Sequence, residues 1–233
     1  MNELEEHRPH DLRPELNAIE TSLALSEEYG ALFWGRKLME QEKVRAILRT
    51  LNEEQIRYAI IGAVALGYHA VPRATADIDI LVRQEDIPKL QKLFQQYYLR
   101  GTAEAMIFDV EGTQIDMLPA NLRMKRVAVD NATAIFVYDI PAKVVSLRDL
   151  ILLKLLAIPE RPGLDKRRQD EADVTTLLAH NADKISQAEI NYIGSSLLRL
   201  AFTPAEVRKY REVIRWLNDT LELLGMADRR YQE

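Results

Sequence analysis

The chain has 233 residues, of which 47% are hydrophobic and 29% are charged. This composition is typical of a folded globular protein with one or two domains. The formal charge is −5, with 31 Lys and Arg against 36 Asp and Glu, which excludes a protein that coats DNA through a general basic excess. The sequence contains no cysteine, which excludes disulfides, thiolate zinc sites and Cys nucleophiles, so metal chemistry would have to rest on carboxylates.

The N-terminal segment gives no sign of export. Residues 1–16 are acidic and contain two prolines, unlike the basic start and apolar run of a signal peptide. The apolar runs at 60–66 and 151–158 are much shorter than the roughly 20 residues that span a bilayer. We therefore expect a soluble, cytoplasmic protein without a membrane partner.

Hydrophobic periodicity predicts two helices between residues 19 and 51, interrupted near Gly30, with the second running over about 35–52. Further predicted elements follow in chain order: a strand at 58–61, a turn at Gly62, a helix of small residues at 64–69, a strand at 76–82, a helix at 88–98, a hairpin of strands at 105–110 and 113–118, and a strand at 134–138. From residue 146 onward the pattern is helical, including helices at 188–200 and 205–224. The sequence thus predicts an α+β (α/β) protein with N-terminal helices at 1–52, a mixed core at 53–145 and a helical domain at 146–233.

Asp77 and Asp79 are the strongest candidates for chemistry. A spacing of two residues on a strand places both carboxylates on one face, about 7 Å apart at the backbone. Two carboxylates aimed at one point suit Mg²⁺, which proteins bind through carboxylates and the phosphate oxygens of a substrate. The alternative is a pair of solvated acids on the wet face of a strand. Asp116, between apolar neighbours on the next acidic strand, is a candidate third ligand.

The turn before this pair is a candidate phosphate site. Gly62 and Ala63 follow a strand and open a helix, so backbone N–H groups and the positive helix end would point at an anion. A tight turn or close packing of helix on sheet is the alternative reason for the glycine. Between the helix and the acidic strand, Arg73 could pair with a phosphate and Thr75 could hydrogen-bond one, although Arg73 alone is more often a surface charge.

The run from Ile60 to Val82, IIGAVALGYHAVPRATADIDILV, resembles the core motif of the nucleotidyltransferase superfamily (polymerase-β-like fold). In that motif a strand, a Gly-Ser or Gly-Gly turn, a short helix and an Asp-x-Asp strand follow in this order. The run is most similar to the bacterial branch that contains the AbiEii toxins of type IV toxin–antitoxin systems and related stand-alone proteins. The resemblance implies a mixed β-sheet flanked by helices and followed by a helical C-terminal region. It also implies that Asp77 and Asp79 bind two divalent metals, Mg²⁺ or Mn²⁺, and that Asp116 is the third acid, which helps to activate the acceptor hydroxyl.

Two downstream segments extend the resemblance. Residues 145–157 resemble the family helix that ends in Lys-Leu-x-Ala, and residues 167–174 resemble its Lys/Arg-x-x-Asp-x-x-Asp-Ile segment. On this pattern Lys154 faces the triphosphate of the NTP, while Asp170 and Asp173 position the lysine or a metal-bound water. Without the family, Lys154 is equally compatible with a snorkelling side chain, and the two aspartates with a solvated helix start.

The resemblance implies transfer of an NMP from an NTP to a hydroxyl acceptor, with Gly62 letting the backbone meet the β- and γ-phosphates and with Arg73 and Lys154 offsetting the charge of pyrophosphate. The acceptor stays open between tRNA or other RNA, a protein hydroxyl and a small molecule. Residues 208–215 on a C-terminal helix carry four basic side chains that form either a solvated face or an RNA-facing one.

Two alternatives remain at the level of sequence. The turn departs from the family at Ala63, so the serine hydroxyl that contacts a phosphate in many members is missing. This departure favours the first alternative, a non-catalytic nucleotide-binding protein or a toxin–antitoxin partner that binds an antitoxin. The other alternative is an aminoglycoside-type nucleotidyltransferase, in which Glu171, Glu189 or Glu206 would help to form a negative pocket for a cationic substrate.

Overall fold

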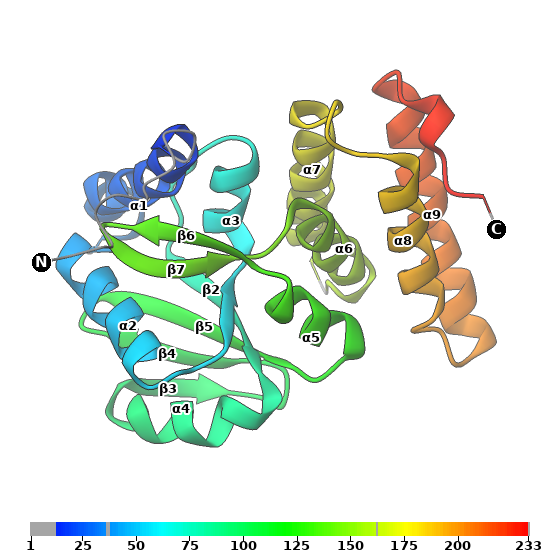
Figure 1. The fold of residues 1–233 in the computed structure, drawn as a ribbon. Coiled ribbons are helices and arrows are strands. Elements are labelled where there is room, and N and C mark those ends of the chain that lie inside the picture. The colour runs from blue at the N-terminus through cyan, green and yellow to red at the C-terminus, as the bar shows by residue number, and fades with distance from the viewer. Residues whose placement is uncertain (1–12, 36–37, 162, 233) are drawn as a thin grey trace, which may run out of the picture. The chain divides into compact units, whose positions relative to one another are not determined.

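The computed structural model describes residues 13–35, 38–161 and 163–232. The chain divides into two compact units, residues 1–145 and 146–233, which are described separately (Figure 1). Within the described residues, no helix is both long enough and apolar enough to cross a membrane.

The first unit is built on a seven-stranded mixed sheet with the order β3-β4-β5-β2-β1-β7-β6. Its strands are β1 (Tyr58–Ile60), β2 (Asp77–Arg83), β3 (Tyr98–Gly101), β4 (Met106–Val110), β5 (Thr113–Ala120), β6 (Thr133–Val137) and β7 (Ile140–Val144). The pairs β2–β5 and β1–β7 are parallel, and the other neighbours are antiparallel. The predicted mixed sheet flanked by helices is therefore confirmed.

Five α-helices belong to the described part of this unit: α1 (Arg13–Trp34), α2 (Gln41–Glu53), α3 (Gly62–His69), α4 (Ile87–Leu93) and α5 (Arg123–Asp130). Helix α1 packs against α3 and β6, α2 packs against β7, and α5 contacts β1, β2 and β5. Alternation builds the core: on β5, Thr113, Ile115 and Met117 are buried while the residues between them are half-buried. This alternation puts one apolar and one polar face on the same strand.

The predicted helix break near Gly30 is wrong. Gly30 is buried inside α1, which continues to Trp34. Gly35 follows the last helical residue, adopts a φ of +69° that suits glycine and donates its N–H to the Ala31 carbonyl at 3.1 Å. The next helix begins at Gln41 rather than near 35, and residues 36–37 of the predicted helix lie outside the described residues.

The second unit is helical and contains α6 (Leu147–Ala157), α7 (Leu164–His180), α8 (Gln187–Leu198) and α9 (Pro204–Leu223). Side chains define three of the helix starts. Ser146 caps α6 by accepting from the Asp149 N–H, and capping boxes pair Ser186 with Glu189 and Thr203 with Glu206. Glu189 and Glu206, which the sequence offered as acids for a cationic substrate, are thus engaged at helix starts.

Candidate active site

The parallel pairing of β2 and β5 brings three aspartates to one face of the sheet. Asp79 lies directly opposite Asp116, and Asp77 lies opposite Gln114. Asp77 and Asp79 share a face because they are two residues apart, and neighbouring strands are about 4.8 Å apart. All three aspartates are half-buried, whereas Ile78 and Ile80 between them are buried on the other face. The acids therefore occupy one polar patch on the first unit.

Gly62 lies against Asp79. The residue has a φ of +65°, and a β-carbon placed on it would be 1.9 Å from Asp79 Oδ2 and 2.7 Å from Asp79 Cγ. At such distances a methyl group would force the Asp79 side chain to move, so both backbone conformation and space favour glycine here. The Ile61 N–H also donates to the Asp79 carbonyl at 2.9 Å. The glycine turn and the acidic strand, which are separate sequence motifs, thus form one site.

Thr75 positions Asp77. Its hydroxyl donates to Asp77 Oδ1 at 2.9 Å, and its own N–H donates to the hydroxyl of Ser26 on α1 at 2.8 Å. Thr75 is buried, and Ser26 is fully buried. The sequence offered Thr75 as a residue that could hydrogen-bond a phosphate, and in the structure its hydroxyl donates to the Asp77 carboxylate. Ser26 was missed, because no local pattern links it to a residue 49 positions away.

The remaining candidates of the turn lie at the start of α3 and in the loop before β2. Ala63 is buried in the first turn of α3, and no side chain caps that helix start. The N–H groups in the first turn of α3 therefore have no capping side chain. Uncapped N–H groups at a helix start are a common setting for anion binding. Arg73 is half-buried in the loop that connects α3 to β2.

The three aspartates offer an all-oxygen donor set, which is the kind that Mg²⁺ and Mn²⁺ take. Within the described residues, however, no group of three or more His, Asp or Glu side chains lies close enough together to hold a metal ion. Two of the carboxylates point at protein donors: Asp77 at Thr75, and Asp116 at the Gln114 amide, which donates at 2.9 Å. The residue types and the backbone register fit a divalent cation. The aspartate side chains would have to rotate before all three carboxylates could bind the same cation.

A second cluster lies inside the second unit. The Lys154 ammonium on α6 donates to Asp170 Oδ1 at 2.9 Å and to Asp173 Oδ2 at 2.7 Å, both on α7. The two carboxylates are only 3% and 6% exposed. Arg161 also donates to Asp170, at 2.7 Å, so two cations balance two anions. The structure thus brings together the three residues of the predicted cluster and adds Arg161.

Electrostatics around Asp170 favour its ionised form. Burial alone would raise its pKa, but the hydrogen bond from Arg161 and the charge and hydrogen bond of Lys154 outweigh burial. The net pKa of Asp170 therefore lies below that of an ordinary aspartate. At neutral pH Asp170 is therefore ionised and accepts these hydrogen bonds as a carboxylate.

The sequence matches no known protein family profile and no curated protein. Solved structures do match. One is the crystal structure of an antigenic nucleotidyltransferase-like protein from Paracoccidioides brasiliensis, which is 17% identical over 82% of this chain and 93% of that one, with a TM-score of 0.52. Another is ANT(2")-Ia in complex with adenylyl-2"-tobramycin, which is 15% identical over 68% of this chain and 97% of that one, with a TM-score of 0.50.

The chain has the nucleotidyltransferase fold. Within this fold, the first unit brings Gly62, Thr75, Asp77, Asp79 and Asp116 into one region, as the register and the contacts above establish. The second unit carries the cluster of Lys154, Asp170 and Asp173 on its own helices.

Proposed function

We propose that this protein is a metal-dependent nucleotidyltransferase, which moves an NMP from an NTP to a hydroxyl acceptor. The observation that carries the proposal is the placement of Asp79 opposite Asp116 in parallel register, with Gly62 directly against the Asp79 carboxylate. Acids from two adjacent strands beside a glycine turn and a helix start would bring cation ligands and phosphate donors to one place. The shared fold agrees with this reading.

Asp77, Asp79 and Asp116 would hold Mg²⁺ or Mn²⁺. When bound, the metal would offset the negative charge of the phosphates at the reacting centre. The protein's own groups orient the site: Thr75 holds Asp77 through its hydroxyl, and the bare Cα of Gly62 leaves room for the Asp79 carboxylate. The N–H groups at Gly62 and Ala63 would bind phosphate oxygens, and Arg73 would offset the charge of the leaving pyrophosphate.

The sequence resemblance alone supports a further proposed role, in which Lys154 supplies a positive charge for the triphosphate. Its ammonium has three N–H donors, of which two bond to Asp170 and Asp173. These two bonds hold a long, flexible side chain in one orientation. In this role Asp170 and Asp173 are positioning residues that act through the lysine.

The acceptor is proposed as tRNA or other RNA, or as a small molecule. The sequence resemblance to the AbiEii branch supports RNA and would bring an antitoxin protein as partner. The solved structure of ANT(2")-Ia contains adenylyl-2"-tobramycin, which supports a small aminoglycoside-like acceptor on the same fold. Either kind of acceptor would receive the NMP on a hydroxyl group, so one experiment can compare them.

A non-catalytic nucleotide-binding role is the second candidate. The observation that favours it is the orientation of the acids: Asp77 and Asp116 bond to Thr75 and Gln114, and no set of three acidic or His side chains in the described residues is gathered around one point. Ala63 in place of the family's serine or glycine points the same way.

Incorporation of label from each α-phosphate-labelled NTP, with Mg²⁺ or Mn²⁺, would test the proposal. Total RNA, purified tRNA, cell protein and a panel of aminoglycosides serve as acceptors, and the variants are Asp77→Asn with Asp79→Asn and, as a control, Asp183→Asn at an exposed site of the second unit. We expect label in one fraction with wild type and the control, and none with the double variant. Label that persists in the double variant would contradict the proposed site, and NTP binding without transfer to any acceptor would favour the non-catalytic role.

A further inference from the structure

One row of register partners crosses the acidic face of the sheet in the first unit. Asp79 on β2 is paired with Asp116 on β5. Beyond Asp116, the row continues through Ile107 on β4 to Arg100 on the edge strand β3. Residues directly opposite each other on neighbouring strands share one face of a sheet, so this row extends the face of the proposed transfer site to the sheet edge. With strands about 4.8 Å apart, the Cα atoms of Arg100 and Asp116 are about 10 Å apart.

A β-bulge in β3 places two consecutive side chains on this acidic face. The register shifts between Tyr98 and Arg100. Tyr98 lies on the other face, where its ring contacts that of the buried Phe108 with 5.7 Å between centroids. A β-carbon on Gly101 would be 2.9 Å from the Tyr98 hydroxyl, so Gly101 shares that other face. By alternation from Tyr98 and from Gly101, both Leu99 and Arg100 lie on the acidic face. Bulges often redirect side chains in this way beside active sites.

The side chains at this end of the row are open to a ligand. Leu99 is 57% exposed, Arg100 is exposed, and Ile107 is half-buried. Within residues 13–35, 38–161 and 163–232, the Arg100 side chain makes no hydrogen bond or ion pair. Asp109, which follows two residues after Ile107 on the same face, accepts the Gly112 N–H at 2.6 Å. Leu99, Arg100 and Ile107, which we call the β3–β4 strip, therefore offer an apolar floor and the N–H donors of one guanidinium.

The β3–β4 strip and the proposed phosphate donors for the NTP lie on opposite sides of the acids. Gly62, which follows β1, lies against Asp79. In the sheet, β1 flanks β2 on one side of the β2–β5 pair, and β4 flanks β5 on the other. If the NTP phosphates bind beside Gly62, the acceptor approaches Asp116 from β4 and β3. The inference below therefore rests on the proposed function.

We propose that the β3–β4 strip binds the acceptor, and that Arg100 contacts a phosphate group of the acceptor. A guanidinium binds phosphate through two parallel N–H···O bonds, whereas it repels an ammonium group. Leu99 and Ile107 would pack against an uncharged part of the acceptor. Arg100 is in this role a specificity-determining residue, which favours phosphate-bearing acceptors over cationic ones. The phosphate can belong to an RNA strand or to a phosphorylated small molecule.

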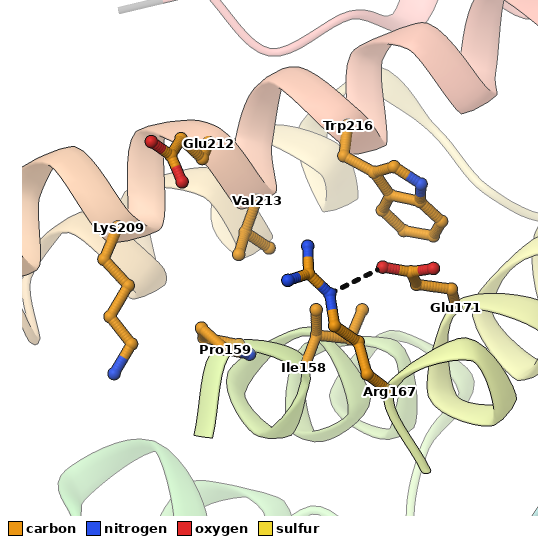
Figure 2. A pocket seen from close by; sticks show the side chains of 8 residues that line it. All are labelled: Ile158, Pro159, Arg167, Glu171, Lys209, Glu212, Val213 and Trp216. Carbon is orange, nitrogen blue, oxygen red and sulfur yellow. Dashed lines mark hydrogen bonds and ion pairs between the residues drawn. The ribbon is translucent and has the colours of Figure 1, made fainter. Parts of the chain in front are cut away.

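Basic side chains at the pocket of the second unit are less suited to a phosphate, because they already have acidic partners. This pocket of about 300 Å³ lies between the end of α6, helix α7 and helix α9 (Figure 2). Arg167 Nε donates to Glu171 Oε1 at 3.0 Å, and Lys209 pairs with Glu160. A phosphate at this pocket would compete with both carboxylates, whereas a phosphate at Arg100 displaces no ion pair.

Binding of two phosphate-bearing probes tests the proposal without metal or NTP. The full chain is titrated in EDTA with a fluorescein-labelled nine-nucleotide oligo-U RNA, followed by anisotropy, and with ribose 5-phosphate, followed by calorimetry. The variants are Arg100→Gln and, as the matched control, Arg49→Gln. Arg49 is an exposed arginine on α2 that also makes no side-chain hydrogen bond or ion pair in the described part of the chain. Arg100→Gln should weaken binding of at least one probe by at least about fivefold, and Arg49→Gln should change neither.

The pattern of the losses identifies the source of the phosphate. Weaker oligo-U binding by Arg100→Gln, with the slope of log K against log salt concentration reduced by about 0.7, identifies an RNA strand. Weaker binding of ribose 5-phosphate alone identifies a phosphorylated small molecule. Absence of binding of both probes by wild type, unchanged binding of both by Arg100→Gln, or equal losses in Arg49→Gln would each overturn the proposal. The titrations involve no transfer step, so absence of nucleotidyl transfer by wild type would count against the proposed function alone.

Discussion

Substitution of Gly62 by alanine would place a methyl group where the Asp79 carboxylate lies. The β-carbon would be 1.9 Å from Asp79 Oδ2, whereas ordinary contact begins at 3.4 Å, so the carboxylate would have to move by about 1.5 Å. A misplacement of about 1 Å can cost roughly 100-fold in rate. We therefore expect nucleotidyl transfer by Gly62→Ala to fall at least 100-fold.

The same substitution should also lower stability. An alanine with a φ of +65° costs about 1–2 kcal/mol, and the crowding of Asp79 adds about 1–3 kcal/mol. Gly35→Ala is the control in the same unit, because Gly35 has a φ of +69° and nothing within 4 Å of its would-be β-carbon. Urea unfolding should show a loss of about 2–5 kcal/mol for Gly62→Ala and only the backbone cost of about 1–2 kcal/mol for Gly35→Ala. Equal losses in the two variants, with transfer retained in Gly62→Ala, would refute the reasoning.

Three further predictions concern the second unit. Lys154→Met leaves Asp170 and Asp173 buried without the lysine, so urea unfolding should show a loss of about 3 kcal/mol in the free energy of unfolding. This value is near the low end for a broken buried pair, because Arg161 still bonds to Asp170. A loss under about 1 kcal/mol would contradict a stabilising role of the cluster. The folded-state pKa of Asp170 is lowered, so its contribution to stability is complete above the unfolded-state pKa of about 3.9 and disappears as the pH falls through the folded-state pKa. Unfolding midpoints measured from pH 6 to pH 3 should accordingly fall less steeply in Asp170→Asn than in wild type. Thr203→Ala removes one half of a capping box and should cost about 1 kcal/mol in thermal or urea unfolding, and an unchanged midpoint would show that α9 does not need its cap.

The local sequence pattern was sufficient to predict the acidic strand and the helical character of the second unit. The alternation of Asp77 and Asp79 with buried isoleucines fixed the strand and the shared face of the two acids. It did not specify that β2 and β5 are parallel neighbours, because strand order depends on contacts between distant segments. The pairing of Asp79 with Asp116 and the contact between Gly62 and Asp79 could therefore be seen only in the structure.

Three elements were missed for identifiable reasons. Strand β7 contains Pro141, which argues against a strand inside a sheet because proline lacks an N–H. All four residues of β3 are exposed, so they show no alternation of buried and exposed positions. Helix α5 is short and follows closely on β5. Leu122 stands at its N-cap position and cannot cap the helix with its side chain, so the sequence has no start signal there. Arg161 was missed because its bond to Asp170 forms across the turn between α6 and α7.

A Mn²⁺-binding measurement tests the proposed transfer site without knowledge of the acceptor. The protein is titrated with Mn²⁺ in the presence of a non-hydrolysable NTP analogue, and electron paramagnetic resonance measures the free ion. Two metal ions are expected to assist phosphoryl chemistry of this kind. Wild type and Asp183→Asn should each bind Mn²⁺ in an NTP-dependent manner, and Asp79→Asn and Asp116→Asn should each lose at least one bound ion. Equal Mn²⁺ binding by all four proteins, or no NTP-dependent binding by wild type, would contradict the assignment of these aspartates as the metal ligands of a nucleotidyltransferase.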